Sequence, residues 1–360
     1  MKVAIVHDYL NQFGGAERVL EVFAEMYPEA PIKTLFYDKK KLEGRFADRV
    51  VPGPLDKDFI KNHHRLFIPA FPFASHMMDA RDADLVISNS VGFAKAAKVS
   101  ESSRHIFYCN AMLRYAWDPN THLRDFIPKA LRPFAYPAAA AMRKWDKWTG
   151  MRPDVIVSNS EYTHDRILRF YGRESEIIHP PVDTGIFYPE KFPSRDYYLA
   201  VGRLIPYKKF DLLVRTFNEL RLPLLIVGDG REYDHLKEMT HSPLIRFTGF
   251  IDDPEKLREI YSKAKGFLFP QVEDFGLVAA EALSCGTPVI GFNAAGAKEM
   301  IIDGINGVVF NTQNCASIKK AVLECERLNF SPEKVAKTAE RFSKESFISK
   351  FKNIVSRLFA

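Results

Sequence analysis

Two acidic residues eight positions apart stand where a predicted strand gives way to a helix. Glu273 lies in the loop after the strand predicted at Gly266–Pro270, and Glu281 lies in the helix predicted from about Leu277. Gly276 at the turn lets the backbone approach a ligand, and the free N–H groups of a helix start favour a phosphate. Carboxylates accept hydrogen bonds from hydroxyls such as those of ribose or a hexose. The pattern predicts an anion site between two acids, although an ordinary solvated helix face would carry the same two glutamates.

Two basic residues follow the strand predicted at Tyr197–Val201. Gly202 ends that strand, Arg203 comes next and Lys208 stands five residues further on. A guanidinium binds an anion through two parallel hydrogen bonds, and an ammonium acts as a point charge. The two cations are therefore suited to neutralise a diphosphate, with simple solvation of a basic loop as the alternative.

Glycine turns follow two further predicted strands. Gly14 and Gly15 separate the first strand from the first helix, and Gly228 and Gly230 follow the strand predicted at Leu224–Val227. Glycine permits a tight turn and a close approach of the backbone to a ligand. A tight turn alone would also explain the pair at the amino end.

Together these motifs resemble those of the family 4 glycosyltransferases, which have the GT-B fold and transfer sugars with retention. Their E-x7-E motif is matched by Glu273 and Glu281, and their G-R-L-x-x-x-K motif by Gly202–Lys208. The chain also carries G-G-A-E-R from Gly14 and a V-G-x-G turn, so the resemblance extends from Gly14 to Val309. Residue 209 is Lys where the family usually has Gly, which is expected to add charge near the two cations.

The resemblance implies a role for each matched residue. Glu281 would bind the nucleotide ribose and Glu273 the donor hexose, while Arg203 and Lys208 would hold the departing diphosphate. The glycine turn at Gly14 would approach the donor phosphate across a cleft between domains. The expected nucleotide-sugar-binding residues are Gly14, Gly15, Gly202, Arg203, Lys208, Gly228, Gly230, Phe250, Ile251, Glu273, Phe275, Gly276, Leu277 and Glu281, and the expected catalytic residues are Glu273, Asn110, Arg203 and Lys208.

One position departs from the family pattern. The segment Tyr108–Asp118 resembles C-H-T-P-M-R-Y-x-W-D of the subgroup that includes O-antigen and exopolysaccharide mannosyltransferases, but Asn110 occupies the histidine position. In the family that histidine holds the donor sugar near the reacting carbon. Asn can still donate and accept hydrogen bonds, so weakened activity or a changed acceptor geometry is expected, with an inactive variant as the alternative. His7, Asp8 and Asp118 are candidates either for contact with the acceptor or for structural roles.

The elements that must position these residues alternate between strands and helices along the chain. Ala16–Met26 shows a helical apolar face, and such alternation with β-branched runs predicts parallel sheets covered by helices. The heptapeptides at Asp84–Ser90 and Asp154–Ser160 share a strand followed by Ser-Asn-Ser, which predicts that each strand exits into a helix N-cap. The remaining predicted strands are Lys2–Val6, Lys33–Tyr37, Arg104–Tyr108, Tyr197–Val201, Leu224–Val227, Gly266–Pro270, Pro288–Phe292 and Val308–Phe310.

A proline-rich segment divides the chain. His179–Arg195 contains four prolines without helical periodicity, which is typical of a domain linker. We therefore predict an α/β protein of the GT-B type, with two Rossmann-like domains that face a central cleft. Residues 1–185 would form the acceptor-binding domain and 186–342 the nucleotide-sugar-binding domain, with an amphipathic helix over 343–360 packing back on the first.

Composition narrows the class of protein. The 360 residues are 46% hydrophobic, enough for two buried cores, and the net charge of +6 predicts a polyanionic partner. No stretch is apolar enough to cross a membrane, and the first strand leaves no room for a signal peptide, so a cytoplasmic location is expected. The four cysteines show no metal spacing and are expected to be structural, and neither a metal nor a cofactor is predicted.

Two regions combine cations with aromatic residues. Lys57–Phe73 couples lysine, histidine and arginine to an aromatic run, and Arg124–Arg152 places Trp145 and Trp148 among basic residues. Such segments suit the headgroup boundary of an anionic membrane, while core-packing helices with solvated edges are the alternative. A lipid-linked acceptor at the inner face of the cell membrane is the hypothesis that follows.

The expected activity is transfer of a hexose to a lipid-linked saccharide or polysaccharide in the synthesis of cell-surface polysaccharide. GDP-mannose is the first choice of donor, and a UDP-hexose is the alternative. A GT-B epimerase or phosphorylase and an inactive nucleotide-sugar-binding homologue are the rival functions. Nucleic-acid binding is disfavoured because no RNP, KH or zinc-finger signature is present.

Overall fold

The chain forms two compact units. The computed structural model describes residues 1–118, 132–191 and 194–360, so the part of the second basic region at 124–131 lies outside the described residues. The first unit comprises Met1–His179 and Ile348–Ala360, and the second comprises Pro180–Phe347. The linker prediction placed the boundary between residues 185 and 186, and the chain divides between His179 and Pro180.

The first unit contains a parallel sheet that is doubly wound. Its described strands lie in the order β3-β2-β1-β4-β5-β6-β7, so the chain moves outward from β1 in one direction and then resumes at β4 on the other side of β1. Every pair is parallel, and the central strands are buried, as their continuous apolar runs predict. The strands are β1 (Val3–His7), β2 (Ile32–Thr34), β3 (Val50–Pro52), β4 (Leu85–Ser90), β5 (Arg104–Cys109), β6 (Val155–Ser158) and β7 (Glu176–Ile177).

Helix α1 packs on this sheet through an apolar face. Val19, Leu20 and Phe23 of α1 are buried, whereas Ala16 and Met26, also assigned to that face, are only partly buried. Phe23 packs against Tyr108 of β5 and against Phe351 near the carboxyl end. The helices are α1 (Gly15–Met26), α2 (Asp58–Asn62), η1 (His64–Ala70), α3 (Phe71–Ser75), η2 (Ala94–Ala96), α4 (Arg114–Trp117), α6 (Arg132–Gly150) and α7 (Glu161–Tyr171).

The two Ser-Asn-Ser sequences adopt different local structures. Ser160 caps α7 by accepting a hydrogen bond from the Thr163 N–H at 3.0 Å, as predicted. The prediction was wrong after β4, where the chain forms only the short 3-10 turn η2. Ser90 there accepts the N–H groups of Gly92 and Ala94. Its hydroxyl therefore organises a turn instead of a helix start.

The second unit has a second doubly wound parallel sheet, in the order β10-β9-β8-β11-β12-β13 among the described strands. The chain reverses its direction of winding between β8 and β11. A ligand site is expected at such a switch point, outside the carboxyl ends of the strands. The strands are β8 (Tyr197–Val201), β9 (Leu224–Val227), β10 (Ile245–Gly249), β11 (Ala264–Phe269), β12 (Val289–Phe292) and β13 (Gly307–Phe310).

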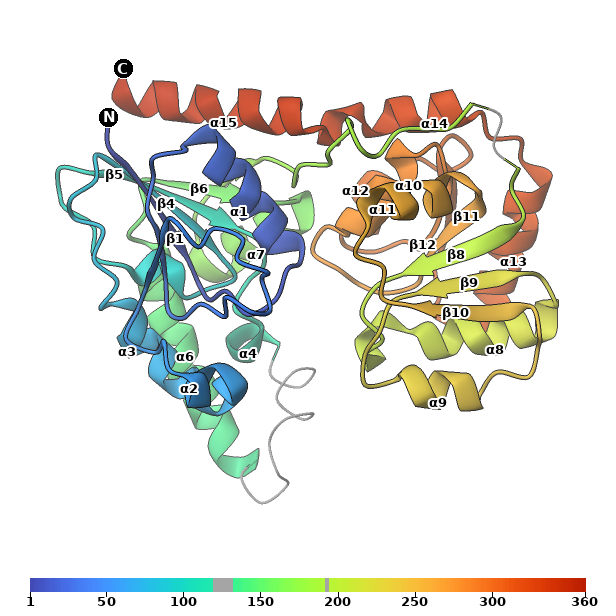
Figure 1. Cartoon of the computed structure of the whole chain (residues 1–360), viewed down its shortest axis with the longest axis horizontal. Helices are drawn as coiled ribbons and strands as arrows, with labels where there is room; N and C mark the ends of the chain where they lie inside the picture. The colour runs from blue at the N-terminus through green and yellow to red at the C-terminus, as the bar shows by residue number, and fades with distance from the viewer. Residues whose placement is uncertain (119–131, 192–193) are drawn as a thin grey trace. The chain divides into compact units, whose positions relative to one another are not determined.

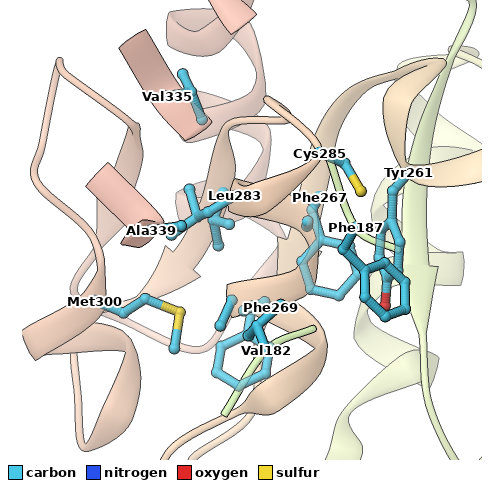
Figure 2. Close-up of a cluster of buried hydrophobic side chains, with 14 of the residues drawn as sticks. Val182, Phe187, Tyr261, Phe267, Phe269, Leu283, Cys285, Met300, Val335 and Ala339 are labelled. Atoms are coloured by element: carbon cyan, nitrogen blue, oxygen red, sulfur yellow. The ribbon is translucent and has the colours of Figure 1, made fainter. Parts of the chain in front are cut away.

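Two cores lie on opposite faces of this second sheet. Phe267 and Phe269 of β11 point to one face and Leu268 to the other, because successive side chains of a strand alternate. Figure 2 shows side chains of α11, α12 and α14 gathered against Phe267 and Phe269. Figure 1 shows α8 and α9 on the opposite face. The helices are η4 (Pro206–Lys208), α8 (Phe210–Leu220), α9 (Tyr233–Glu238), α10 (Pro254–Ser262), α11 (Leu277–Ser284), α12 (Gly296–Met300), α13 (Cys315–Arg327), α14 (Pro332–Ala339) and η5 (Glu340–Phe342).

The carboxyl-terminal helix, α15 (Lys344–Phe359), begins in the second unit and continues into the first after Phe347. Phe351, Ile354 and Val355 are buried, whereas Ile348 and Leu358 are partly exposed. Arg357 pairs with Glu176 of β7 at 2.5 Å. Residues 348–360 thus pack within the same unit as the amino-terminal sheet.

Most predicted strand bounds lie within two residues of the observed ones. The strand predicted at Lys33–Tyr37 ends early, at Thr34, and only an isolated bridge between Leu10 and Tyr37 continues it. The prediction missed β3, β7 and β10. The first two are edge strands of three and two residues, and β10 alternates buried and exposed positions instead of forming an apolar run.

Three of the four free cysteines, Cys109, Cys285 and Cys325, are buried. Burial raises the pKa of Cys285 and of Cys325 to about 12, so neither thiol ionises readily. Among the described residues, no group of three or more His, Cys, Asp or Glu side chains is placed to hold a metal ion. No helix in the described part of the chain has the length and apolarity needed to cross a membrane.

Candidate active site

The switch point of the second sheet brings a lysine and a glutamate together. Lys208 ends the turn η4 after β8, and Glu273 lies in the loop after β11, the neighbouring strand. The Lys208 Nζ donates a hydrogen bond to Glu273 Oε1, and Gln271 Nε2 donates to the same oxygen at 3.0 Å. Both ends of the ion pair are largely buried, with side chains 10 and 15% exposed. The two motifs predicted from separate parts of the sequence therefore meet in one place.

The turns after β8 and β9 pack backbone against backbone. A Cβ atom on Gly228 would lie 1.9 Å from the Gly202 carbonyl oxygen, and its φ of +139° is unfavourable for any other residue. The Gly202 N–H donates to the Val227 carbonyl, and the Leu204 N–H donates to Asp229. The V-G-x-G turn therefore supports the loop that carries Arg203 and Lys208.

Gly276 forms the entrance to α11 in a left-handed conformation, with φ of +97°. A Cβ at this position would lie 2.4 Å from the Phe269 ring, so only glycine fits. The helix that follows begins at Leu277, and its first N–H groups have no partner within the helix. The side chain of Phe275 packs on Phe342 in the core, so Phe275 can serve a ligand only through its backbone.

Glu281 is buried inside the second unit. Its side chain is 1% exposed, and the Tyr261 hydroxyl donates to its Oε2 at 3.0 Å. Tyr261 comes from α10, and Figure 2 shows its ring beside Phe187 and Phe267. The Tyr261 hydroxyl is therefore one side-chain partner that holds the Glu281 carboxylate in place. Sequence analysis did not identify Tyr261 or Gln271, because a single Tyr in a helix and a single Gln in a loop carry no motif.

The other residues predicted in this unit stand at the carboxyl edge of the same sheet. Arg203 is exposed after β8, and Phe250 and Ile251 follow β10. Phe250 is 71% exposed, whereas Ile251 packs against the core. Gly230 follows β9 and packs on Leu204. The predicted positions therefore line the ends of four adjacent strands.

The switch point of the first unit lies between β1 and β4, and a chain of polar contacts runs along it. The Gly14 N–H donates to Glu17 Oε2 at 2.9 Å, and Glu17 Oε1 lies 3.5 Å from His7 Nε2. Asn89 Nδ2 lies 3.2 Å from His7 Nδ1, and Asn110 Nδ2 donates to Asn89 Oδ1 at 2.6 Å. The chain thus connects the glycine turn with Asn110 inside one unit. Gly15, the first residue of α1, is exposed.

Two other polar candidates have structural partners. The Asp8 carboxylate accepts hydrogen bonds from the Ser90 hydroxyl and from the backbone N–H groups of Val91, Phe93 and Ala94, at 2.6 to 3.0 Å. Asp118 pairs with an arginine of α7 at 2.5 Å. Their bonds hold the loop after β4 and the end of α4, which favours the structural alternative for both.

The arrangement is suited to binding a phosphate-bearing ligand with hydroxyl groups. A helix start, a buried ammonium and an exposed guanidinium lie at one edge of the second sheet, where they favour negative charge. The carboxylate of Glu273 stands at the same edge as an acceptor for hydroxyls. In the first unit, side-chain amides and an imidazole supply further polar groups.

Comparison with protein families matches each part of the chain to a glycosyltransferase model. Residues 13–185 match "Glycosyltransferase Family 4", and residues 186–345 match "Glycosyl transferases group 1". A GDP-mannose-dependent alpha-(1-6)-phosphatidylinositol monomannoside mannosyltransferase of Mycolicibacterium smegmatis is 30% identical over 48% of this chain and 53% of its own. An uncharacterized glycosyltransferase of Methanocaldococcus jannaschii is 26% identical over 56% of this chain and 58% of its own. The chain thus spans a little over half the length of these curated relatives.

Solved structures share the fold. The HepE protein of Anabaena in complex with UDP-glucose has a TM-score of 0.73 at 16% identity, covering 99% of this chain and 100% of that one. A sucrose-phosphate synthase of Thermosynechococcus elongatus also has a TM-score of 0.73 at 16% identity, and the match covers 100% of this chain and 99% of that one. At this identity the likeness concerns the fold, and it agrees with the prediction of two Rossmann-like domains.

Proposed function

Since both of its parts match their models, the chain belongs to the family 4 glycosyltransferases of the GT-B fold, and we propose that it transfers a hexose from a nucleoside diphosphate sugar to an acceptor hydroxyl. The observation that carries this proposal is the meeting of Lys208 and Glu273 at the switch point of the second sheet, beside the start of α11. One group suits the diphosphate and the other suits the hydroxyls of a sugar.

The reaction breaks the bond between the anomeric carbon and the diphosphate oxygen and forms a bond to the acceptor oxygen, whose proton is released. Negative charge builds up on the departing diphosphate. In the proposed mechanism, Lys208, Arg203 and the N–H groups of α11 stabilise that charge, which is the largest contribution expected in such a site. Glu273 accepts hexose hydroxyls and Glu281 accepts ribose hydroxyls. The two cations and the helix start balance the leaving group without a metal ion.

The proposed donor is GDP-mannose, with transfer by retention. The motif match to the mannosyltransferase subgroup supports this choice, as does the name of the relative from Mycolicibacterium smegmatis. A UDP-hexose is the second candidate, because HepE, which shares the fold, binds UDP-glucose. A panel of nucleoside diphosphates in a thermal-shift assay separates the two, since a ligand at one hundred times its Kd stabilises the native state by about 2.7 kcal/mol.

Product analysis tests the activity itself. Incubation with GDP-mannose and UDP-glucose plus a lipid-linked saccharide acceptor should give an elongated acceptor and free nucleoside diphosphate, and NMR of the product reports the anomeric configuration. An interconverted sugar nucleotide would instead indicate an epimerase. A sugar phosphate formed with inorganic phosphate would indicate a phosphorylase. Binding of the nucleotide sugar without any product would indicate an inactive homologue.

We further propose that the acceptor is lipid-linked and that the first unit meets an anionic membrane at the inner face of the cell membrane. Phe59, Leu66 and Phe73 are 65, 74 and 75% exposed in a segment that also exposes lysine and arginine. Trp148 of α6 is 55% exposed and stacks on His76, which places α6 beside the chain that follows α3. Exposed aromatic residues among cations favour the boundary of an anionic bilayer.

Flotation with vesicles tests this membrane contact. The protein should float with phosphatidylglycerol-containing vesicles and stay at the bottom with phosphatidylcholine alone. The Phe59→Ser/Phe73→Ser variant should lose flotation. Ile305→Ser, which removes a 55% exposed apolar side chain from the second unit, is the matched control and should float normally. Flotation of all variants alike, or of none including the wild type, contradicts the proposal.

A further inference from the structure

One carboxylate oxygen of Glu273 accepts hydrogen bonds from two side chains of the second unit. Lys208 Nζ and Gln271 Nε2 both donate to Oε1, the latter at 3.0 Å. A carboxylate only accepts hydrogen bonds, so the Gln271 atom that faces it is the amide nitrogen. Gln271 is 3% exposed, and its amide therefore has little access to water. A charged donor from the turn after β8 and a neutral donor from the loop after β11 thus hold the same oxygen.

The loop that carries Gln271 and Glu273 is held in place at both ends. The Pro270 carbonyl accepts a hydrogen bond from Gln313 Nε2 at 2.7 Å, and the Glu273 carbonyl accepts one from the Gly296 N–H at 3.0 Å. Both donors come from other elements, because Gln313 follows β13 and Gly296 begins α12. The carboxylate of Glu273 therefore extends from a fixed backbone.

Lys208 is the partner that can move. Its ammonium ends a flexible chain of four carbons, and it lies 4.0 Å from the position that a Cβ atom on Gly202 would occupy, at the end of β8. The proposed function places the diphosphate at this edge of the sheet. A diphosphate that attracts the ammonium weakens the bond between Lys208 and Glu273. Gln271, which carries no charge, is not attracted in this way and still holds the carboxylate.

We propose that Gln271 is a positioning residue for Glu273, and that Glu273 competes with the diphosphate of the donor for Lys208. In the free protein, Lys208 neutralises Glu273. When the diphosphate binds, Lys208 turns toward it and Gln271 keeps the carboxylate in place. This inference rests on the proposed function and adds a regulation of its site, and all three residues belong to the second unit.

Calorimetry with GDP and UDP tests the competition. Glu273→Gln keeps the size of the side chain and an acceptor oxygen but removes the charge that competes for Lys208. The variant should bind the nucleoside diphosphate about tenfold more tightly than the wild type, because Lys208 is no longer shared with a carboxylate. The affinity for guanosine and uridine should not change. Unchanged or weaker binding of the nucleoside diphosphate overturns the inference.

Gln271→Met should have the opposite effect. Methionine fills a similar volume but donates no hydrogen bond, so Glu273 depends more on Lys208 and releases it less readily. The Kd for the nucleoside diphosphate should rise by about fivefold. Normal affinity in this variant also overturns the inference.

Gln313→Met is the matched control for Gln271→Met. Gln313 holds the same loop, but it donates to the Pro270 carbonyl and not to the carboxylate of Glu273. Its replacement should change the Kd for the nucleoside diphosphate by less than about twofold. A loss equal to that in Gln271→Met would show that any loosening of the loop weakens binding, which contradicts the role given to Gln271.

A double-mutant cycle separates competition for Lys208 from direct repulsion of the ligand. Both expected effects act through Lys208, so in the Lys208→Met background Glu273→Gln and Gln271→Met should leave the Kd unchanged. If Glu273→Gln tightens binding equally in this background, its charge repels the diphosphate directly, and the competition is refuted. Gln271→Met keeps both charges of the ion pair, so its half of the cycle decides the question if Glu273→Gln fails to fold.

Binding and activity measurements distinguish failure of this inference from failure of the proposed function. A wild-type protein that binds a nucleoside diphosphate but transfers no sugar contradicts the proposed function, and the Kd values of the variants then still decide the role of Gln271. An active wild type whose affinity is the same in Gln271→Met contradicts the inference alone. A wild type that binds neither nucleoside diphosphates nor inorganic pyrophosphate contradicts both.

Discussion

At the scale of single residues, the basic and acidic motifs of the second unit are joined by an ion pair between Lys208 and Glu273. Lys208 is largely buried in this ion pair. The Glu273 carboxylate also accepts a hydrogen bond from the Gln271 side chain. Under the proposed function, the diphosphate of the donor would therefore share Lys208 with Glu273. The pair keeps a buried ammonium from standing without a partner, which would be costly.

Replacement of this lysine should weaken the binding of the phosphates and leave the binding of the nucleoside unchanged. Lys208→Met should weaken the binding of a nucleoside diphosphate by about 1.5–3 kcal/mol, the usual value for a hydrogen bond to a charged group. The affinity for the nucleoside without phosphates should not change. Isothermal titration calorimetry measures both, and Lys209→Met is the matched control at the next position. An equal loss in the control would mean that general charge, and not Lys208, attracts the diphosphate.

The partner of Glu281 gives a second prediction at this scale. Tyr261→Phe removes the hydroxyl that donates to Glu281 Oε2 and leaves a buried carboxylate oxygen without that bond, which should lower the free energy of unfolding by about 1–3 kcal/mol. It should also weaken nucleoside binding, because Glu281 loses its fixed orientation. Tyr197→Phe, which removes a hydroxyl bonded to the Ile260 carbonyl, should leave nucleoside binding intact. Urea unfolding and calorimetry measure the two effects, and unchanged nucleoside affinity in Tyr261→Phe would refute the role given to Glu281.

At the scale of elements, the start of α8 contains a local conflict. Lys209, which stands where the family usually has glycine, is in the left-handed conformation, with φ of +61° and ψ of +30°. A side chain in this conformation costs about 1–2 kcal/mol. The turn tolerates the cost because Phe210, Leu213 and Phe217 of α8 are buried against the sheet.

The two smallest replacements at this position separate charge from conformation. Lys209→Gly and Lys209→Ala both remove the charge, but only glycine relieves the left-handed backbone. The glycine variant should therefore exceed the alanine variant in free energy of unfolding, by about 1 kcal/mol. Urea denaturation of the two variants measures the difference. Equal stability, or a more stable alanine variant, would show that the turn adopts another conformation in solution.

At the scale of the whole molecule, the two units differ in their spectroscopic reporters and in their buried titratable groups. All three tryptophans, Trp117, Trp145 and Trp148, belong to the first unit. The same unit contains His105, whose pKa is lowered to about 3, chiefly by burial and further by Arg152. Tryptophan fluorescence therefore reports on the unit whose stability His105 affects.

This histidine should make the first unit less stable in mild acid. In the unfolded chain the imidazole binds a proton below about pH 6.5, whereas in the folded chain it remains neutral down to about pH 3. The unfolded state thus binds more protons in this window, and the free energy of unfolding falls by about 1.4 kcal/mol per pH unit as the pH drops. Between about pH 7.5 and 5.5, the wild type should lose about 1.4 kcal/mol more than His105→Gln. Urea unfolding followed by tryptophan fluorescence measures the free energy of unfolding of both proteins at each pH. If the free energies of the two proteins fall in parallel as the pH drops, the prediction is contradicted.

Local sequence patterns were enough to predict most of the strands of this protein and the position of its candidate site. Apolar runs of the β-branched type identified ten of the strands, and the spacing of Glu273 from Glu281 and of Arg203 from Lys208 identified the edge of the second sheet. Such patterns are visible because period and turn chemistry are local properties of the chain. The edge strands β3 and β7 are too short to show a period.

Only the tertiary structure decided which partner each polar group has. Lys208 and Glu273 are 65 residues apart in the chain, and the order of strands, with β8 beside β11, makes them neighbours. Asn89 and Asn110 are 21 residues apart and meet because β4 lies beside β5. Hydrogen bonds need atoms within about 3 Å. Sequence motifs therefore identify which chemical groups are present, and the strand order and register of the parallel sheets bring these groups into contact.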